Sequence, residues 1–379
     1  MKTLRIIGTA ITDFGELYDK SLSDLFREAV DEALLDAQLP ASAIEAVFVA
    51  NKAGGSFNHQ RHLNALVSQF FPHYPPAMRI EGACASGSLA VLAAEQALLS
   101  GIYETVLVVG AEKMTDVSSA ETTAILASAA DHEKEYASTF PALYALLADY
   151  HMQKFGTTRE ELSAVVVKNH QHALQNPHAQ FHKALSAAAV SRSALVASPL
   201  RVLDCSPISD GAAALILSSK PLPAKAEVLG FGQGQDALAL ADRDDISGLN
   251  ATKKALSNAI KMSKLSIKNI DAAEVHDCFS IAEILAVEDL GFCPKGMGGK
   301  WIASGSATFG AKVVINPSGG LKACGHPVGA TGVKQIAFLS QQIAAGKFAH
   351  ALSHNVGGSG ATAVVHILGP AAAVKGIKK

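Results

Sequence analysis

A cysteine at position 84 combines two features of a nucleophilic thiol. Cys84 directly precedes Ala85-Ser86-Gly87, where a long apolar helix is predicted to begin. The unpaired backbone N–H groups and the dipole at a helix N-terminus favour a thiolate. The small neighbours leave room for an acyl group, so Cys84 is a candidate for covalent catalysis. A buried structural cysteine is the alternative that this segment leaves open.

A histidine at position 326 lies in a second segment, rich in glycine, that spans residues 316–332. Glycines on both sides of His326 allow the backbone to approach a substrate closely. We expect His326 to act on the Cys84 thiol. The alternative is a histidine whose hydrogen bonds are satisfied inside the turn.

A third group, His276-Asp277-Cys278-Phe279, follows a strand predicted at residues 270–276. Ligands of α/β folds bind beyond the carboxyl ends of strands, where His276 and Cys278 could supply a hydrogen-bond donor and a proton shuttle. We expect no metal, because these two residues are only two apart and no second pair at ligand spacing accompanies them. The further histidines are interpreted as a solvated helix face: His170, His172, His178 and His182.

Two internal repeats indicate how these side chains are positioned. A helical apolar stripe followed by a strand occurs at residues 23–50 and again at 250–276. Residues 85–87 are followed by Gly101 and a strand at 105–109, and residues 330–332 by Gly346 and a strand at 351–354, with the same spacing to the glycine. We therefore predict two similar α/β halves, a largely parallel sheet and a pseudo-twofold axis near which equivalent helix N-termini meet. Chance similarity of two unrelated segments is the alternative.

The predicted domains follow from this duplication. Residues 1–115 and 200–220 form the first half, and residues 221–379 form the second. Residues 116–199 are alanine-rich and mostly helical, and are interpreted as an insertion into the first half. The glycines at 230, 232 and 234 suggest a strand edge or a turn rather than a nucleotide-binding loop, since no helix follows at the required place.

Composition excludes several classes of protein. The net charge of −2 provides no general basic field for nucleic acid. No apolar run approaches the length of about 18 residues that a membrane span needs, and no secretory signal is recognised. The five cysteines are odd in number and widely spread, which fits free thiols in the cytoplasm.

The three motifs together resemble the signatures of the thiolase superfamily. They are Cys84-Ala85-Ser86-Gly87, His276-Asp277-Cys278-Phe279 and Gly325-His326-Pro327. The similarity is greatest to the sterol-carrier-protein type and the archaeal-type acetyl-CoA acetyltransferases. It implies a duplicated α/β fold of two βαβαβαββ halves around a pseudo-twofold, with a mostly helical loop domain inserted in the first half.

The resemblance also implies roles in the reaction. Cys84 would be acylated, His326 would take its proton, and His276 would serve an oxyanion hole. Asn355 stands where common thiolases carry a second cysteine, so Cys278 would be the acid and base. Two further residues would contribute a backbone N–H to an oxyanion hole and a contact near the pantetheine arm, respectively: Gly358 and Ser206.

The implied activity is acetyl-CoA C-acetyltransferase or 3-ketoacyl-CoA thiolase. Coenzyme A would be substrate and product, held by the loop domain, and no cofactor would be bound permanently. The resemblance further implies a homodimer or homotetramer. Three alternatives stay open: a C-acyltransferase that depends on a small zinc-ribbon and OB-fold partner, a ketoacyl or hydroxymethylglutaryl-CoA synthase, and a non-catalytic acyl-CoA carrier.

Overall fold

The computed structural model describes residues 2–372, which fold into two halves and an insertion. The first half contains β1 (Leu4–Ile11), α1 (Leu22–Ala37), β2 (Ala46–Ala50), α2 (Gly54–Phe57), α3 (Leu63–Ser68), β3 (Ala77–Ile80), α4 (Ser86–Ser100), β4 (Thr105–Glu112) and β7 (Gly211–Ser218). Between β4 and β7 lie α5 (Ser119–Ala127), α6 (Phe140–Phe155), α7 (Arg159–Ala173), α8 (Ala187–Arg192), β5 (Leu195–Ala197) and β6 (Leu200–Arg201). The second half contains β8 (Ala226–Gln235), α9 (Asn250–Ser263), β9 (Ala272–Glu274), α10 (Ser280–Asp289), α11 (Gly298–Ala303), β10 (Val314–Ile315), α12 (Gly320–Cys324), α13 (Val328–Ala344), β11 (Ala351–Gly357) and β12 (Thr362–Gly369).

The strands of the two halves have the same spatial order. The order is β3-β2-β4-β7-β1 in the first half and β10-β9-β11-β12-β8 in the second, and β1 joins β8 to complete one sheet of ten strands. The order of elements along the chain is also the same, which confirms the duplicated βαβαβαββ fold. The expectation of a largely parallel sheet is wrong. β2 is parallel to β3 and β4, and β9 is parallel to β10 and β11. β12 follows β11 through a short turn and is antiparallel to it, and β7 is antiparallel to β4 after the insertion.

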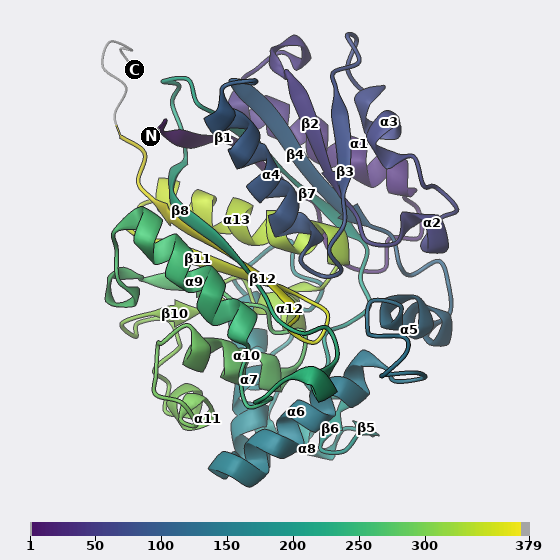
Figure 1. The fold of residues 1–379 in the computed structure, drawn as a ribbon, viewed down its shortest axis with the longest axis vertical. Helices are drawn as coiled ribbons and strands as arrows, with labels where there is room; N and C mark the ends of the chain where they lie inside the picture. The colour runs from purple at the N-terminus through teal and green to yellow at the C-terminus, as the bar shows by residue number, and fades with distance from the viewer. Residues whose placement is uncertain (1, 373–379) are drawn as a thin grey trace.

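Helices α4 and α13 form the centre of the molecule (Figure 1). Apolar side chains of both helices pack in one core with residues of β1, β4, β7 and β11. A second core lies between the first-half strands and α1 and α3, and a third contains α9 and α10. The two repeated helices that follow Cys84 and His326 are therefore in direct contact.

The glycines of β8 explain a second departure from the sequence-based expectation. β8 is an interior strand that pairs with β12 and with β1, and is neither an edge nor a turn. A Cβ atom on Gly230, Gly232 or Gly234 would collide with the backbone of α9. The alternate glycines thus allow α9 to pack directly on the strand.

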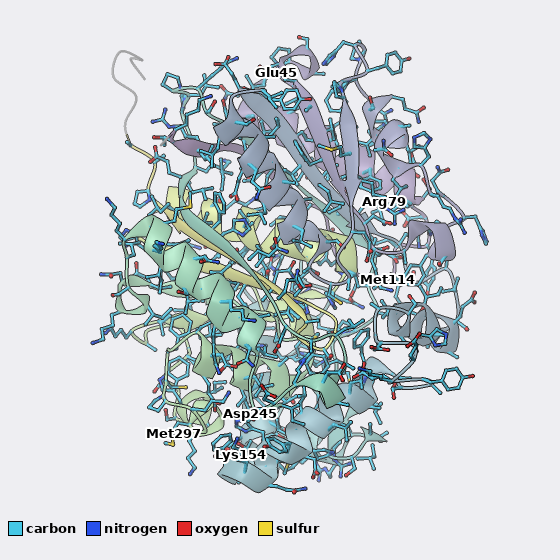
Figure 2. All side chains as sticks on the ribbon, in the orientation of Figure 1. Glu45, Arg79, Met114, Lys154, Asp245 and Met297 are labelled. Atoms are coloured by element: carbon cyan, nitrogen blue, oxygen red, sulfur yellow. The ribbon has the colours of Figure 1, made fainter. Side chains whose placement is uncertain are left out.

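The insertion leaves the first half and packs on the second. Leu143, Tyr144 and Leu162 share the core of α9 and α10. Lys154 of α6 and Asp245, which follows β8, lie together at the bottom of Figure 2 and form an ion pair of 3.1 Å. The insertion therefore packs on the second half through α6 and α7, and its α5 contacts α2 of the first half.

One window in the described residues meets the length and apolarity of a membrane span, contrary to the expectation from sequence. It covers Ala83–Ser100 and coincides with α4. More than half of the window (56%) is buried inside the fold. Because α4 lies between strands and against α13, its apolar character is that of a core helix.

Candidate active site

Cys84 lies in a tight turn between β3 and α4. The turn is closed by Ser86, whose hydroxyl accepts from the Gly82 N–H at 3.0 Å and donates to the Ala83 carbonyl at 2.6 Å. Ala83 adopts a φ of +53°, which is unusual for a residue with a Cβ. The turn thus holds Cys84 in one backbone conformation just before the first residue of α4.

The structure brings Cys84 together with both predicted histidines. The Sγ atom of Cys84 and one ring nitrogen from each of His276 and His326 all lie within 4.8 Å of one another. The two imidazole rings are edge to face, with centroids 5.2 Å apart. Since His326 precedes α13 and Cys84 precedes α4, the trio assembles where the two repeated helices begin.

Hydrogen bonds determine which nitrogen of His326 carries its hydrogen. Nδ1 lies 2.7 Å from the hydroxyl of Thr331, and that hydroxyl donates to the Pro327 carbonyl at 3.0 Å. The Thr331 oxygen must therefore accept from Nδ1–H. Nε2 then has a free lone pair and no hydrogen-bond partner among residues 2–372, so it can accept the proton of Cys84.

His276 adopts the opposite tautomer. The Asn355 Oδ1 accepts from the Ser88 N–H at 3.4 Å, which orients the amide so that its Nδ2 donates to His276 Nδ1 at 3.1 Å. Nε2 of His276 therefore bears the hydrogen, and within the described chain this N–H has no acceptor. His276 can donate to a substrate oxygen, and in this tautomer it cannot ligate a metal ion together with Cys84 and His326.

Burial keeps the resting site uncharged. It raises the pKa of Cys84 to about 11, against the opposing effects of Lys52 and of a hydrogen bond from the Gly358 N–H. Burial also lowers the pKa of His326 to about 3. Desolvation thus opposes the thiolate that the helix N-terminus favours. The resting pair is a thiol beside a neutral imidazole, although Cys84 keeps partial exposure to solvent.

Gly358, Cys278 and Tyr144 complete the surroundings of the thiol. Gly358 has a φ of +63° in the turn between β11 and β12, and its N–H points to Cys84. The hydroxyl of Tyr144 donates to the Gly358 carbonyl at 3.1 Å, and its ring stacks on Phe279 with centroids 4.6 Å apart. Nothing in the sequence distinguished Tyr144, because an aromatic residue in an apolar helix is usually part of the hydrophobic core.

A cavity of about 140 Å³ connects these groups. Its walls include Cys84, Cys278 and His326, together with Ser206 and Met114, the last of which is labelled in Figure 2. The Ser206 N–H donates to the Cys278 carbonyl at 2.9 Å, which fixes the segment at 205–208 against the strand end that carries Cys278. Cys84, Cys278 and His326 therefore share one largely apolar space, whereas His276 lies behind them and is not part of its lining.

Comparison with known proteins identifies the family. The profile "Thiolase, N-terminal domain" matches residues 4–221, and "Thiolase C-terminal domain-like" matches residues 232–370. The chain belongs to the thiolase family. The acetyl-CoA acetyltransferase of Methanothermobacter thermautotrophicus is 45% identical over 97% of this chain and 99% of its own, and bovine sterol carrier protein 2 is 34% identical over 95% and 71%.

Solved structures show the same fold. The chain matches an Ltp2-ChsH2(DUF35) aldolase with a TM-score of 0.83 and 24% identity, over 97% of this chain and 98% of that one. It matches human mitochondrial 3-ketoacyl-CoA thiolase with a TM-score of 0.78 and 18% identity, over 98% and 99%. The duplicated halves described above are thus the thiolase fold.

Buried carboxylates hold the glycine-rich segments of this thiolase in place. Asp277 accepts from the Leu321 N–H at 2.6 Å and the Lys322 N–H at 3.1 Å, so it anchors α12 immediately before His326. Glu112 accepts from the Gly329 N–H at 2.9 Å and the Lys52 N–H at 2.8 Å, and so joins the start of α13 to the first half. These residues position the segments that carry the reactive groups.

Burial distinguishes among the further histidines and describes the surroundings of Cys324. His170 and His172 are buried in α7, and Nδ1 of each donates to a backbone carbonyl, of Lys183 and of Asn316 respectively, so the interpretation of a solvated face is wrong for them. His178 and His182 do face solvent at least in part. Cys324 is fully buried, accepts from the Asn176 amide at 3.3 Å and does not line the cavity, so it is a packing residue.

Proposed function

We propose that this thiolase is an acetyl-CoA C-acetyltransferase or 3-ketoacyl-CoA thiolase that works through an acyl-Cys84 intermediate. The observation that carries the proposal is the unpartnered Nε2 of His326, held toward the Cys84 thiol by Thr331. The acetyl-CoA acetyltransferase of Methanothermobacter, with which the chain shares 45% identity, supports the choice of acyl donor.

In the first half-reaction, His326 Nε2 accepts the proton of Cys84 as the sulfur attacks the thioester carbonyl. The charge that develops on the carbonyl oxygen is stabilised by the Gly358 N–H, which faces Cys84. The coenzyme A sulfur takes the proton of Cys278, and coenzyme A leaves as the thiol. This step yields acyl-Cys84, an imidazolium at His326 and a thiolate at Cys278.

In the second half-reaction, the Cys278 thiolate removes a proton from the α-carbon of a second acetyl-CoA. The enolate oxygen accepts hydrogen bonds from Nε2–H of His276 and of protonated His326. The α-carbon attacks the acyl carbonyl, the Cys84 thiolate leaves and His326 returns its proton. Thiolysis is the reverse sequence, so every proton is accounted for in both directions.

The test is intact-mass measurement after incubation with acetoacetyl-CoA or acetyl-CoA. We expect one acetyl group on the wild type and none on Cys84→Ala. Cys205→Ala is the matched control, because Cys205 lines the same cavity and has no role in the mechanism. Absence of the adduct from the wild type, or its presence on Cys84→Ala, would contradict the proposal.

Coenzyme A is proposed to reach the cavity along the insertion at residues 116–199. Thr123, Leu126, Phe140 and Pro141 from this segment line the cavity opposite Cys84, and Ser206 lies beside them. No permanent cofactor is included in the mechanism. Protection of the insertion against hydrogen exchange by coenzyme A would support this arrangement, and unchanged exchange there would oppose it.

We propose a homodimer or homotetramer that forms through the edge of the sheet. β3 ends the first-half order, and Met78 in it and Tyr74 beside it are 54% and 69% exposed. An exposed edge strand with apolar side chains favours pairing with another strand. Light scattering of the purified chain, and of Met78→Pro, tests whether this edge is the contact.

A partner-dependent acyltransferase is the second candidate. It is supported by the similarity of fold to the Ltp2-ChsH2(DUF35) aldolase. A small zinc-ribbon and OB-fold partner would then be needed for turnover, whereas the first candidate is active alone.

We also propose that the protein is located in the cytoplasm. The free thiols at all five cysteines of residues 2–372 agree with this location.

A further inference from the structure

Tyr144 lines the cavity together with Gly358 and Cys278. Its hydroxyl donates to the Gly358 carbonyl at 3.1 Å, and the Cys278 thiol lies near enough for the hydroxyl to influence its protonation. Both its ring and its hydroxyl are buried, with 1% of the residue exposed. The stacked Phe279, which follows Cys278 in sequence, leaves the ring little freedom to move.

We propose that Tyr144 is a positioning residue that controls the proton of Cys278. The inference rests on the proposed function, in which Cys278 gives up a proton and later recovers it. Tyr144 comes from α6, so the insertion supplies a part of the reaction centre as well as a wall of the cavity.

The direction of the hydrogen bonds defines what Tyr144 does in each state. While Cys278 is a thiol, the Tyr144 hydroxyl donates a hydrogen bond to the Gly358 carbonyl, and the phenol oxygen is free to accept one from the Cys278 S–H group. When Cys278 becomes a thiolate, the same hydroxyl can rotate to donate to sulfur. A charged acceptor makes the stronger hydrogen bond, so this exchange stabilises the thiolate.

Two further observations agree with this role. Burial raises the pKa of Cys278, and the hydroxyl of Tyr144 opposes that effect. Burial also raises the pKa of Tyr144 itself well above its usual value, so the phenol keeps its hydrogen and serves as a donor throughout the cycle. Tyr144 therefore orients and stabilises, and Cys278 transfers the proton.

The experiment follows exchange of the acetyl-CoA methyl hydrogens in D₂O, which reports proton removal separately from acylation of Cys84. Tyr144→Phe retains the ring that stacks on Phe279 and removes only the hydroxyl. We expect exchange about tenfold slower, since one hydrogen bond to a charged group is lost, with the pH dependence displaced to higher pH. Acylation should also be slower, because Cys278 gives up its proton in that step, but intact mass after long incubation should show acetyl-Cys84 at the wild-type level.

Tyr150→Phe is the control, because Tyr150 lies on the same helix, is 37% exposed and does not line the cavity. Exchange by Tyr144→Phe at the wild-type rate and pH dependence would overturn the proposal. Failure of Tyr144→Phe to reach the wild-type level of acetyl-Cys84 would also overturn it, because it would show a general structural role. Absence of acetyl-Cys84 from the wild-type protein would refute the proposed function instead. Exchange by Cys278→Ala at the wild-type rate would show that Cys278 is not the base, and would thereby refute the role proposed for Tyr144.

Discussion

Gly87 and Gly332 touch across the axis that relates the two halves. A Cβ atom on Gly87 would lie 2.8 Å from the backbone nitrogen of Gly332. The two glycines occupy equivalent places in the repeat, Gly87 as the second residue of α4 and Gly332 as the fifth residue of α13. Their contact sets the distance between the segments that carry Cys84 and His326.

The first prediction concerns this contact. Gly87→Ala should lower the free energy of unfolding by about 1–3 kcal/mol, because the added methyl meets only backbone atoms. It should also slow acylation, because the helices must separate. Gly15→Ala is the control, since no described atom lies within 4 Å of a Cβ at that position. Equal melting temperatures for both variants would show that the helix contact can relax.

The second prediction concerns the tautomer of His326. Thr331→Val removes the oxygen that accepts from Nδ1–H and leaves a buried donor without a partner, which costs about 1–3 kcal/mol. We expect acylation of Cys84 to be at least about tenfold slower by this reasoning. Thr331→Ser keeps the hydroxyl and should recover most of the rate. If serine and valine variants behave alike, the hydroxyl does not orient the histidine.

The third prediction concerns the resting charge of the site. With the pKa of Cys84 raised to about 11, the thiolate fraction should grow about tenfold with each pH unit below that value. The rate of alkylation by iodoacetamide, measured at Cys84 by intact mass, should therefore rise from pH 7 to 10. Cys84→Ala identifies alkylation at other cysteines. A rate that is already constant near pH 7 would indicate a thiolate–imidazolium pair.

The fourth prediction compares a buried and an exposed ion pair. Lys334 and Glu274 are both buried, their charged atoms are 3.1 Å apart, and Lys334 also bonds to Ser318. Lys334→Met leaves the Glu274 carboxylate without its cation and should cost about 3–5 kcal/mol. Lys134→Ala breaks the solvent-exposed pair with Asp242 and should not measurably change the midpoint of urea unfolding. A small effect at Lys334 would mean that Glu274 becomes protonated.

Much of the arrangement could be predicted because the sequence contains the same helix–strand units in both halves. The repeat placed residues 85–87 and 330–332 at equivalent helix starts, and the structure packs those helices together. The repeat carries no information about strand direction, since β7 is antiparallel to β4 across the long insertion and β12 is antiparallel to β11 across a turn. The turn at 358–361 is short, and it makes β12 antiparallel to β11.

Burial limited the prediction of the site. The motifs identified Cys84, His276, Cys278 and His326, which the structure brings together. The sequence could not show that desolvation keeps Cys84 protonated, nor that α7 packs inward and buries His170. Tyr144 was missed because its role depends on Phe279 and Gly358, which lie far from it along the chain.

The origin of the cavity walls has a consequence for how substrate range can change. Cys84, His326 and Cys278 come from the duplicated halves, whereas Leu126, Phe140 and Pro141 come from the insertion. Substitutions in α5 and α6 can therefore reshape the space for an acyl chain without moving the groups that form and break bonds. Tyr144 differs from these positions. Its substitution would change the shape of the cavity and also the hydrogen bonding at Gly358 and the proposed control of the Cys278 proton.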